Sequence, residues 1–240
     1  MMFSDCKNLT SIPEGLLPAT TLAPNCYSHM FSSCDNLTSI PEGLLPATTL
    51  APNCYSYMFS SCHNLTSIPK LPATNLANNC YEYMFDACGK LTSIPVGLLP
   101  ATTLAPNCYS SMFNSCFKLT SIPAGLLPAT TLVNNCYEYM FTGCGYFKSI
   151  PEGLLPATTL APYCYSHMFD SCRLKNIPRL LLPATNLANN CYEYMFADNY
   201  SITYTPSLPA ENLADNCYER MFQFCGKLSS VSFGGNTIGL

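Results

Sequence analysis

The chain has 240 residues, only 10% of them charged, and a formal net charge of −4. An average domain carries roughly 25% charged residues, and the acidic balance here offers no basic surface to nucleic acid or to an anionic membrane. No apolar stretch approaches the roughly 18 residues of a membrane span, and the first residues lack the basic and apolar regions of a signal peptide.

Internal repetition dominates the sequence and therefore decides the fold. The motif Met-Phe-x-x-Cys begins at Met2 and returns at positions 30, 58, 84, 112, 140, 168 and 221, while Met195-Phe196 has Asn199 in place of the cysteine. Successive motifs lie 26–28 residues apart, and the block SIPEGLLPATTLAP recurs unchanged at 11–24, 39–52 and 149–162. We predict a single repeat domain over 1–240, with about eight repeats, starting in mid-repeat; whether it is a fragment of a longer chain stays open.

The first element predicted in each repeat is a short helix, over residues 25–34 in the second repeat. Asn25 is a typical helix cap, and pairs such as Asn79 and Glu82 fit a capping box. At about 100° per residue, the apolar side chains of this segment cover one arc of about 140°. That arc is formed by Cys26, Tyr27, Met30, Phe31 and Cys34.

The second predicted element is a short strand, Leu37 to Pro41, which the proline ends because it cannot donate to a ladder. Stacked at about 4.8 Å, such strands would form a narrow parallel sheet. Leu45, Leu50 and Ala51 would then line the return path of the coil.

The order Phe31-x-x-Cys34-x-x-Leu37-x-x-Ile40 resembles the BspA-like leucine-rich repeats of bacterial surface proteins. The resemblance implies an α/β repeat solenoid: a right-handed leucine-rich-repeat coil with short parallel strands on one face and short helices on the other. It also implies an adhesin or another binding protein. This chain departs from the usual unit in having Pro41 directly after Ile40.

The sixteen cysteines fall into two series with one member of each in nearly every repeat. They could form disulfides or a metal ladder, but zinc ligands usually come as close pairs such as Cys-x-x-Cys. Side chains in a ladder also run parallel, which is poor geometry for a disulfide. We favour buried, reduced thiols that act as small apolar residues, and we expect no metal and no cofactor.

The chain is not expected to be an enzyme. Its histidines are His29, His63 and His167, and every serine or cysteine near them is a repeated element. Catalysis needs a unique constellation of groups, whereas here each group is copied.

Two sets of residues are candidates for binding. The position before Met-Phe forms a row that we place on the convex side as an exposed aromatic ridge, because tyrosine is favoured in binding surfaces; alternatively, its rings merely stack and seal the flank. The second set lies on the concave sheet, where the copies disagree. The first set is His29, Tyr57, Tyr83, Tyr139, His167 and Tyr194, with Ser111 and Arg220 in the same row, and the second is Lys175, Asn176, Arg179 and Tyr204.

These features favour a non-enzymatic protein-binding scaffold of adhesin type, at the cell surface or extracellular. Such a scaffold would bind a protein ligand and no nucleic acid. One alternative is an intracellular or phage-encoded inhibitor of another protein, located in the cytoplasm, which the many thiols favour. The other is a structural spacer or fibre formed by end-to-end self-association.

Overall fold

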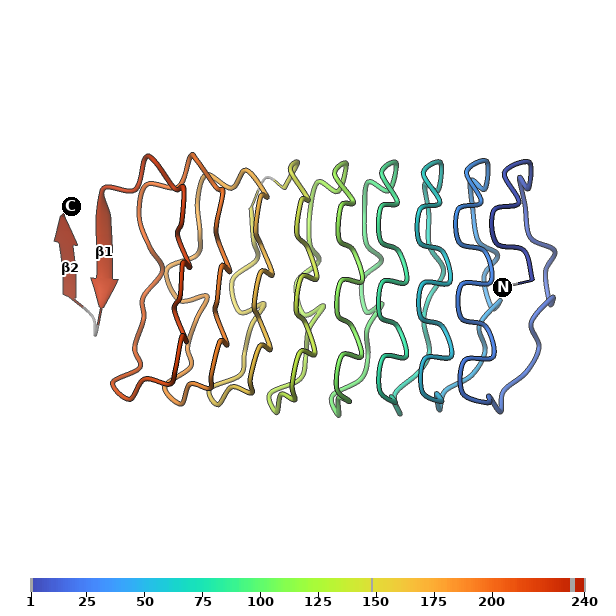
Figure 1. The fold of residues 1–240 in the computed structure, drawn as a ribbon, viewed down its shortest axis with the longest axis horizontal. Coiled ribbons are helices and arrows are strands. Elements are labelled where there is room, and N and C mark those ends of the chain that lie inside the picture. The colour runs from blue at the N-terminus through green and yellow to red at the C-terminus, as the bar shows by residue number, and fades with distance from the viewer. Residues whose placement is uncertain (1, 148, 234–235, 240) are drawn as a thin grey trace.

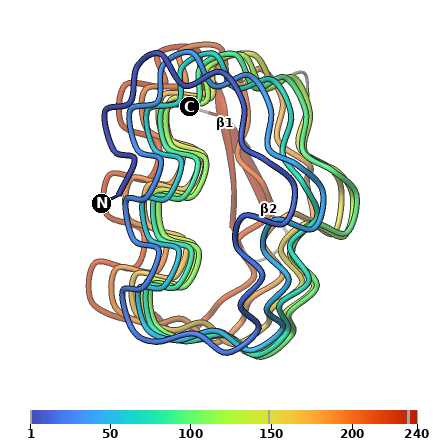
Figure 2. The same ribbon diagram turned by 90° about the vertical axis from the view of Figure 1, so that its right-hand side faces the viewer.

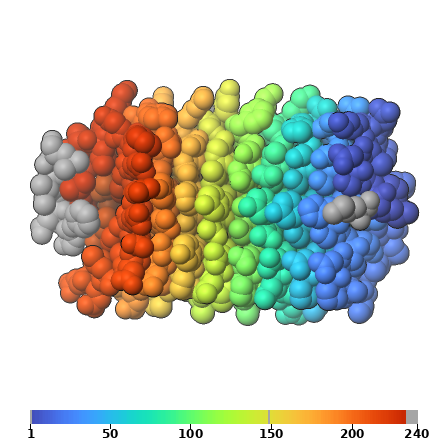
Figure 3. Space-filling view, in the orientation of Figure 1, coloured from blue at the N-terminus to red at the C-terminus, as the bar shows by residue number. Residues whose placement is uncertain are grey.

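Successive repeats stack side by side along one long axis, with the two termini at opposite ends (Figure 1). The computed structural model describes residues 2–147, 149–233 and 236–239. In the space-filling view the repeats appear as closely packed parallel bands (Figure 3). Each repeat is one coil of a solenoid, and a continuous apolar core runs through the middle of the stack.

The predicted helices are wrong, because no α-helix occurs among the residues that the structure describes. Residues 25–34 instead form overlapping reverse turns. Within this run the N–H of Ser28 donates to the carbonyl of Asn25, and the N–H of Met30 to that of Tyr27, each three residues earlier. Every fourth residue has a positive φ, as in the third position of a type II turn: 60° at Asn25, 55° at His29 and 58° at Ser33.

The N–H groups that close no turn form hydrogen bonds to the next coil. The Tyr27 N–H donates to the Cys54 carbonyl at 3.0 Å, and the His29 N–H to the Ser56 carbonyl at 2.9 Å. The same pattern recurs in later coils, and it has one direction: the N–H groups of a coil donate to the carbonyls of the following coil. The backbone of this turn face is therefore satisfied both within a coil and between coils.

Coil spacing explains why helices do not form on the turn face. Phe3, Phe31 and Phe59 occupy the same position in successive coils, and their ring centroids lie 5.4 and 5.5 Å apart. An α-helix with its side chains is about 10 Å across. Helices on successive coils would need about twice this spacing, so the chain folds this face into a flat run of turns.

The predicted sheet at Leu37 to Pro41 is also wrong as a set of strands, because residues 37–41 have no strand structure. Neighbouring coils are joined there by single bonds, such as the Thr66 N–H to the Thr38 carbonyl at 3.0 Å. The proline that ends each segment leaves too few N–H groups for a longer ladder. Isolated parallel bridges occur elsewhere on the coil, between Thr49 and Asn75 and between Thr131 and Thr159.

The strands of the described chain form one antiparallel hairpin at the carboxyl-terminal end. Strand β1 (Ser230–Phe233) pairs with β2 (Asn236–Gly239), with Val231 opposite Ile238. The first residue of β1 also forms a parallel bridge to Tyr204 in the preceding coil. Strand β1 thus continues the stack beyond the last coil, and β2 lies outside β1 (Figure 1).

The core consists of columns of like side chains, one from each coil. The Phe column runs from Phe3 to Phe222 and the Tyr column from Tyr27 to Tyr218, with neighbouring rings nearly parallel throughout. Leucine, isoleucine and methionine fill the space between these columns. The leucine-rich-repeat organisation expected from the sequence is therefore present, but it is built without helices.

Candidate binding surface

The row of residues before Met-Phe forms a stacked aromatic surface on the turn face, here called the aromatic row. It consists of His29, Tyr57, Tyr83, Ser111, Tyr139, His167, Tyr194 and Arg220. The centroids of His29 and Tyr57 lie 4.5 Å apart, and so do those of Tyr57 and Tyr83. The stack resumes at Tyr139, with spacings of 4.4 and 4.6 Å, and it ends where the Arg220 guanidinium covers the Tyr194 ring.

Backbone conformation directs these side chains outward. Each member of the row is the middle one of the three positive-φ residues in its turn run, with φ of 56° at Tyr57 and 54° at Tyr83. The flanking Met58 and Phe59 point into the core and are fully buried. The sequence-predicted residues of this row are thus brought together on one face, half-buried against one another.

Ser111 divides the aromatic row into two groups of rings. Its side chain is fully buried, and its hydroxyl has no hydrogen-bond partner among the described residues. Its neighbours along the row are Tyr83 in the preceding coil and Tyr139 in the following one. Because a serine carries no ring, the stack is interrupted by one coil.

The aromatic row lies on the inside of a shallow bend. Its rings repeat every 4.4–4.6 Å, whereas the buried Tyr column repeats every 5.7–6.0 Å. A stack whose outer face has a shorter repeat than its core bends toward that face. Figure 2 shows that the stack is bent, because the middle coils are displaced to one side of both ends. The expected convex position of the row is therefore wrong.

Carboxyl groups flank the rings. Glu82 accepts a hydrogen bond from the Asn79 amide at 3.0 Å, and Asp170 lies 3.0 Å from the His167 imidazole. The predicted pairing of Asn79 with Glu82 is thus present, although it caps no helix. Burial raises the pKa of Glu82 and lowers that of His29. The result is an acidic surface with closely packed rings.

Two tyrosine hydroxyls of the row, those of Tyr57 and Tyr139, hold their protons tightly. Burial, followed by the nearby Tyr83 and Glu82, raises the pKa of Tyr57 to about 12. Burial and then Glu138 do the same for Tyr139, also to about 12. At neutral pH these hydroxyls are therefore hydrogen-bond donors and acceptors without charge.

The second predicted set lies on a different part of the coil, beyond the cysteine that ends the turn run. Lys175, Asn176 and Arg179 are exposed, and Tyr204 is 38% exposed. Lys175 lines one groove, whereas Arg179 and Tyr204 line another. Sequence analysis missed Arg173, which lines the groove of Lys175. The missed signal is that the repeat has only one residue between Cys172 and Leu174, where earlier repeats have two.

The thiols are structural. All cysteines are free, and all but Cys6 and Cys26 are buried. In the cysteine series that includes Cys34 and Cys62, the sulfur donates to a Phe carbonyl of the preceding coil. The distance from Cys62 Sγ to the Phe31 carbonyl oxygen is 3.2 Å. Burial raises the pKa of Cys62 to about 12, so such thiols are poor nucleophiles.

Metal-ion sites and membrane-spanning helices are both lacking among the residues that the structure describes. In that part of the chain, no group of three or more His, Cys, Asp or Glu side chains could hold a metal ion. The same residues include no helix of the length and apolarity that crossing a membrane requires.

Comparison with known proteins gives a family match. The model for the BspA type leucine-rich repeat region (6 copies) matches residues 1–110, 27–165, 55–203 and 107–239. A leucine-rich repeat protein from Bacteroides ovatus ATCC 8483 is similar in structure, with 20% identity and a TM-score of 0.47; the match covers 96% of this chain and 62% of that one. A leucine rich cell surface protein from Faecalibacterium prausnitzii A2-165 has 15% identity and a TM-score of 0.30, over 87% of this chain and 76% of that one. No curated protein matches significantly.

Proposed function

Because the chain belongs to the BspA-type leucine-rich repeat family, we propose that it is a non-enzymatic scaffold that binds another protein at a bacterial cell surface, as an adhesin does. The observation that carries the proposal is the aromatic row on the inside of the bend. Solenoids commonly bind their ligands on an extended concave surface, and tyrosine is enriched where proteins bind one another.

The row is organised before any partner arrives. Its rings are held by stacking at 4.4–4.6 Å, so binding orders few additional rotamers and costs little conformational entropy. Glu82 lies close enough to Tyr57, and Glu138 and Glu193 to Tyr139, to act on these rings electrostatically. This chemistry suits a partner that presents lysine, arginine or backbone N–H groups.

A capture experiment tests the proposal. The tagged chain would be incubated with a surface-protein extract and, separately, with bacterial cytosol, and direct binding of each captured protein would then be measured. In the test variant the tyrosines at 57, 83, 139 and 194 are changed to serine. A matched control changes the exposed residues Thr48, Thr102 and Thr130 to alanine.

We expect a surface protein to bind the original chain and the threonine variant but to lose at least tenfold in affinity for the tyrosine variant. Circular dichroism of both variants would check that the solenoid is intact. Equal binding by all three chains would reject the aromatic row as the site. A partner found in cytosol alone would favour the intracellular inhibitor.

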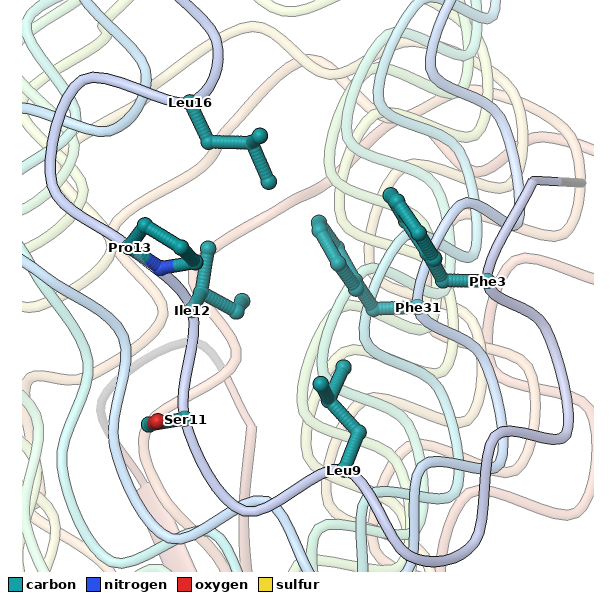
Figure 4. A pocket seen from close by; sticks show the side chains of 7 residues that line it. All are labelled: Phe3, Leu9, Ser11, Ile12, Pro13, Leu16 and Phe31. Carbon is teal, nitrogen blue, oxygen red and sulfur yellow. The ribbon is translucent and has the colours of Figure 1, made fainter.

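Open ends of the core favour end-to-end self-association as a second candidate function. At the amino-terminal end an apolar cavity of about 210 Å³ lies beside the outermost ring of the Phe column, Phe3, with Ile12 and Leu16 facing it (Figure 4). At the other end, the N–H groups of Tyr218 and Phe222 have no backbone acceptor among the described residues. Sedimentation velocity at rising concentration tests this: larger species support the fibre, whereas a constant monomer rejects it.

A further inference from the structure

The one basic region of the described chain interrupts the repeat at residues 173–179. We propose that Arg173, Lys175 and Arg179, together with Tyr146 and Tyr204, form a second binding surface for an acidic segment of a partner protein. The surface is here called the cationic patch. It lies on a different part of the coil from the aromatic row and does not depend on the function proposed for that row.

Charge is concentrated in the cationic patch. Its three cations fall within seven residues, although the whole chain has only 10 lysines and arginines and a net charge of −4. All three are exposed. The ion pairs of the described residues involve His63, His167 and Arg220, so none of the three cations of the patch forms an ion pair with a described carboxylate.

The first part of the patch is an open groove of about 520 Å³, lined by Gly145, Tyr146, Phe147, Arg173 and Lys175. Arg173 lies against Gly145 of the preceding coil: a Cβ at this glycine would be 3.4 Å from Arg173 Cδ, an ordinary van der Waals distance. The guanidinium stem can therefore lie across the preceding coil. Tyr146 borders the same groove and is 61% exposed.

A second groove, of about 450 Å³, is lined by Arg179, Tyr204, Thr205, Ser230 and Ser232. Tyr204 is held in place by its bridge to Ser230. Each groove thus combines a cation with an exposed tyrosine, and the Tyr204 hydroxyl of the second can bond a peptide backbone. Both are open rather than enclosed, which suits a chain crossing the surface.

Two nearby carboxylates, Asp198 and Asp170, have other partners. Asp198 accepts a hydrogen bond from the Tyr200 hydroxyl at 3.0 Å, and Asp170 lies against His167 and Ser171. Glu152 occupies the position after Ile-Pro in the preceding repeat, as Arg179 does in its own, and forms no ion pair within the described chain.

The chemistry of the patch favours an acidic protein segment. Arginine binds carboxylates through two parallel hydrogen bonds, and arginine and tyrosine are the residues that contribute most to protein–protein binding. Nucleic acid is disfavoured, because its binding proteins neutralise about 6–10 phosphates and this patch has three cations.

The test uses a fluorescein-labelled 12-residue peptide of alternating aspartate and glycine, with binding measured by fluorescence anisotropy in 20 mM and 300 mM salt. We expect saturable binding that weakens at high salt, since the attraction is between exposed charges. The triple variant Arg173→Glu, Lys175→Glu, Arg179→Glu should lose at least tenfold in affinity. The control reverses three exposed lysines elsewhere, Lys7→Glu, Lys70→Glu and Lys90→Glu, and changes net charge equally.

The outcome is decided by comparing the two triple variants, both first shown to fold by circular dichroism. Binding that the patch variant loses and the control keeps supports the proposal. An equal loss of peptide affinity in both variants would show attraction by net charge alone and would overturn the proposal. A complete absence of peptide binding by the original chain would overturn it too. Binding of heparin without binding of the peptide would also overturn it, because the ligand would then be a sulfated polysaccharide. The aromatic-row tyrosine variant should bind the peptide normally, so failure of either function can be told from failure of the other.

Discussion

At the scale of the residue, the most unusual feature is the left-handed backbone of the turn face. A positive φ is uncommon for any residue with a side chain, and it costs most for bulky ones. Asn25 tolerates it because its short amide can bond locally, but Tyr57 and Tyr83 do not have this advantage. Their strain is offset by inter-coil hydrogen bonds and by stacking.

Ala87 offers a direct test of that strain. It has a φ of 56° and is half-buried, so Ala87→Gly removes a steric clash at a position that glycine adopts freely. We expect the free energy of unfolding to rise by about 0.5 kcal/mol once the entropy of the unfolded glycine is included. Urea denaturation measures it. The control is Ala73→Gly, at a buried residue without a positive φ, which should lower the free energy of unfolding. If Ala87→Gly lowered it by the same amount, the account would be contradicted.

The Tyr column provides a second prediction at this scale. The hydroxyls of Tyr109 and Tyr137 are buried without a hydrogen-bond partner among the described residues. Burying an unpaired hydroxyl costs about 1–3 kcal/mol. Tyr109→Phe should therefore raise the free energy of unfolding by about 1 kcal/mol, whereas Tyr139→Phe on the half-buried row should change it little. Destabilisation by Tyr109→Phe would show that the hydroxyl is bonded in solution.

At the scale of the element, burial was predictable and backbone conformation was not. Cys26, Tyr27, Met30, Phe31 and Cys34 follow a spacing of one, three, one and three residues, which is a period of four. Over ten residues this period is hard to distinguish from the 3.6 of a helix. The inward positions were therefore correctly chosen for a helix that does not form: their equivalents in the next coil are all buried, although Cys26 itself is exposed. What separates the two structures is the distance to the next coil, which no single repeat encodes.

The candidate sites were predictable to a similar extent. The aromatic row could be found because its members share one position in the repeat, and Lys175, Asn176, Arg179 and Tyr204 because the copies disagree there. The side of the bend on which the row lies could not be found, because curvature depends on small differences in spacing between core and surface. Arg173 was missed because the groove that it lines is shared with Gly145 and Tyr146 of the neighbouring coil, which lie far from it in the sequence.

The Phe column gives a prediction for the element as a whole. Phe113 is fully buried between Phe85 and Phe141, with ring centroids 5.8 Å away on both sides. Phe113→Ala should cost about 3–5 kcal/mol of unfolding free energy. Phe3→Ala should cost less, because Phe3 is half-buried and stacks on one ring among the described residues. Urea denaturation of both variants checks this, and equal costs would mean that the end coil is packed as tightly as the middle.

At the scale of the whole molecule, the buried thiols make stability depend on alkaline pH. An unfolded cysteine has a pKa of about 8.5, whereas burial raises the folded value to about 12 for several of them. The folded chain then holds more protons than the unfolded chain, so stability is complete below about pH 8.5 and falls as pH rises toward 12. These thiols are Cys54, Cys62, Cys80, Cys136 and Cys191.

The expected effect is large because the thiols act together. Each contributes a loss of about 1.4 kcal/mol per pH unit, and five of them at pH 10 would remove about 10 kcal/mol, comparable to the stability of a typical domain. Thermal unfolding between pH 7 and 11, with reductant present, should show Tm falling steeply above pH 9. Cys62→Ala should make the fall of Tm with pH less steep, because it removes one of the titrating thiols. A Tm that stays constant up to pH 11 would contradict the account.

The one-way direction of the inter-coil hydrogen bonds on the turn face also concerns how the chain is made. Because N–H groups such as those of Tyr27 and His29 find their acceptors in the following coil, each coil leaving the ribosome has unpaired donors until the next coil has been synthesised. The folding front therefore trails the point of synthesis by about one repeat. A pause within a repeat would leave a row of free N–H groups open to wrong pairing, and the near-identity of the repeats would make a neighbouring molecule an easy substitute for the correct coil.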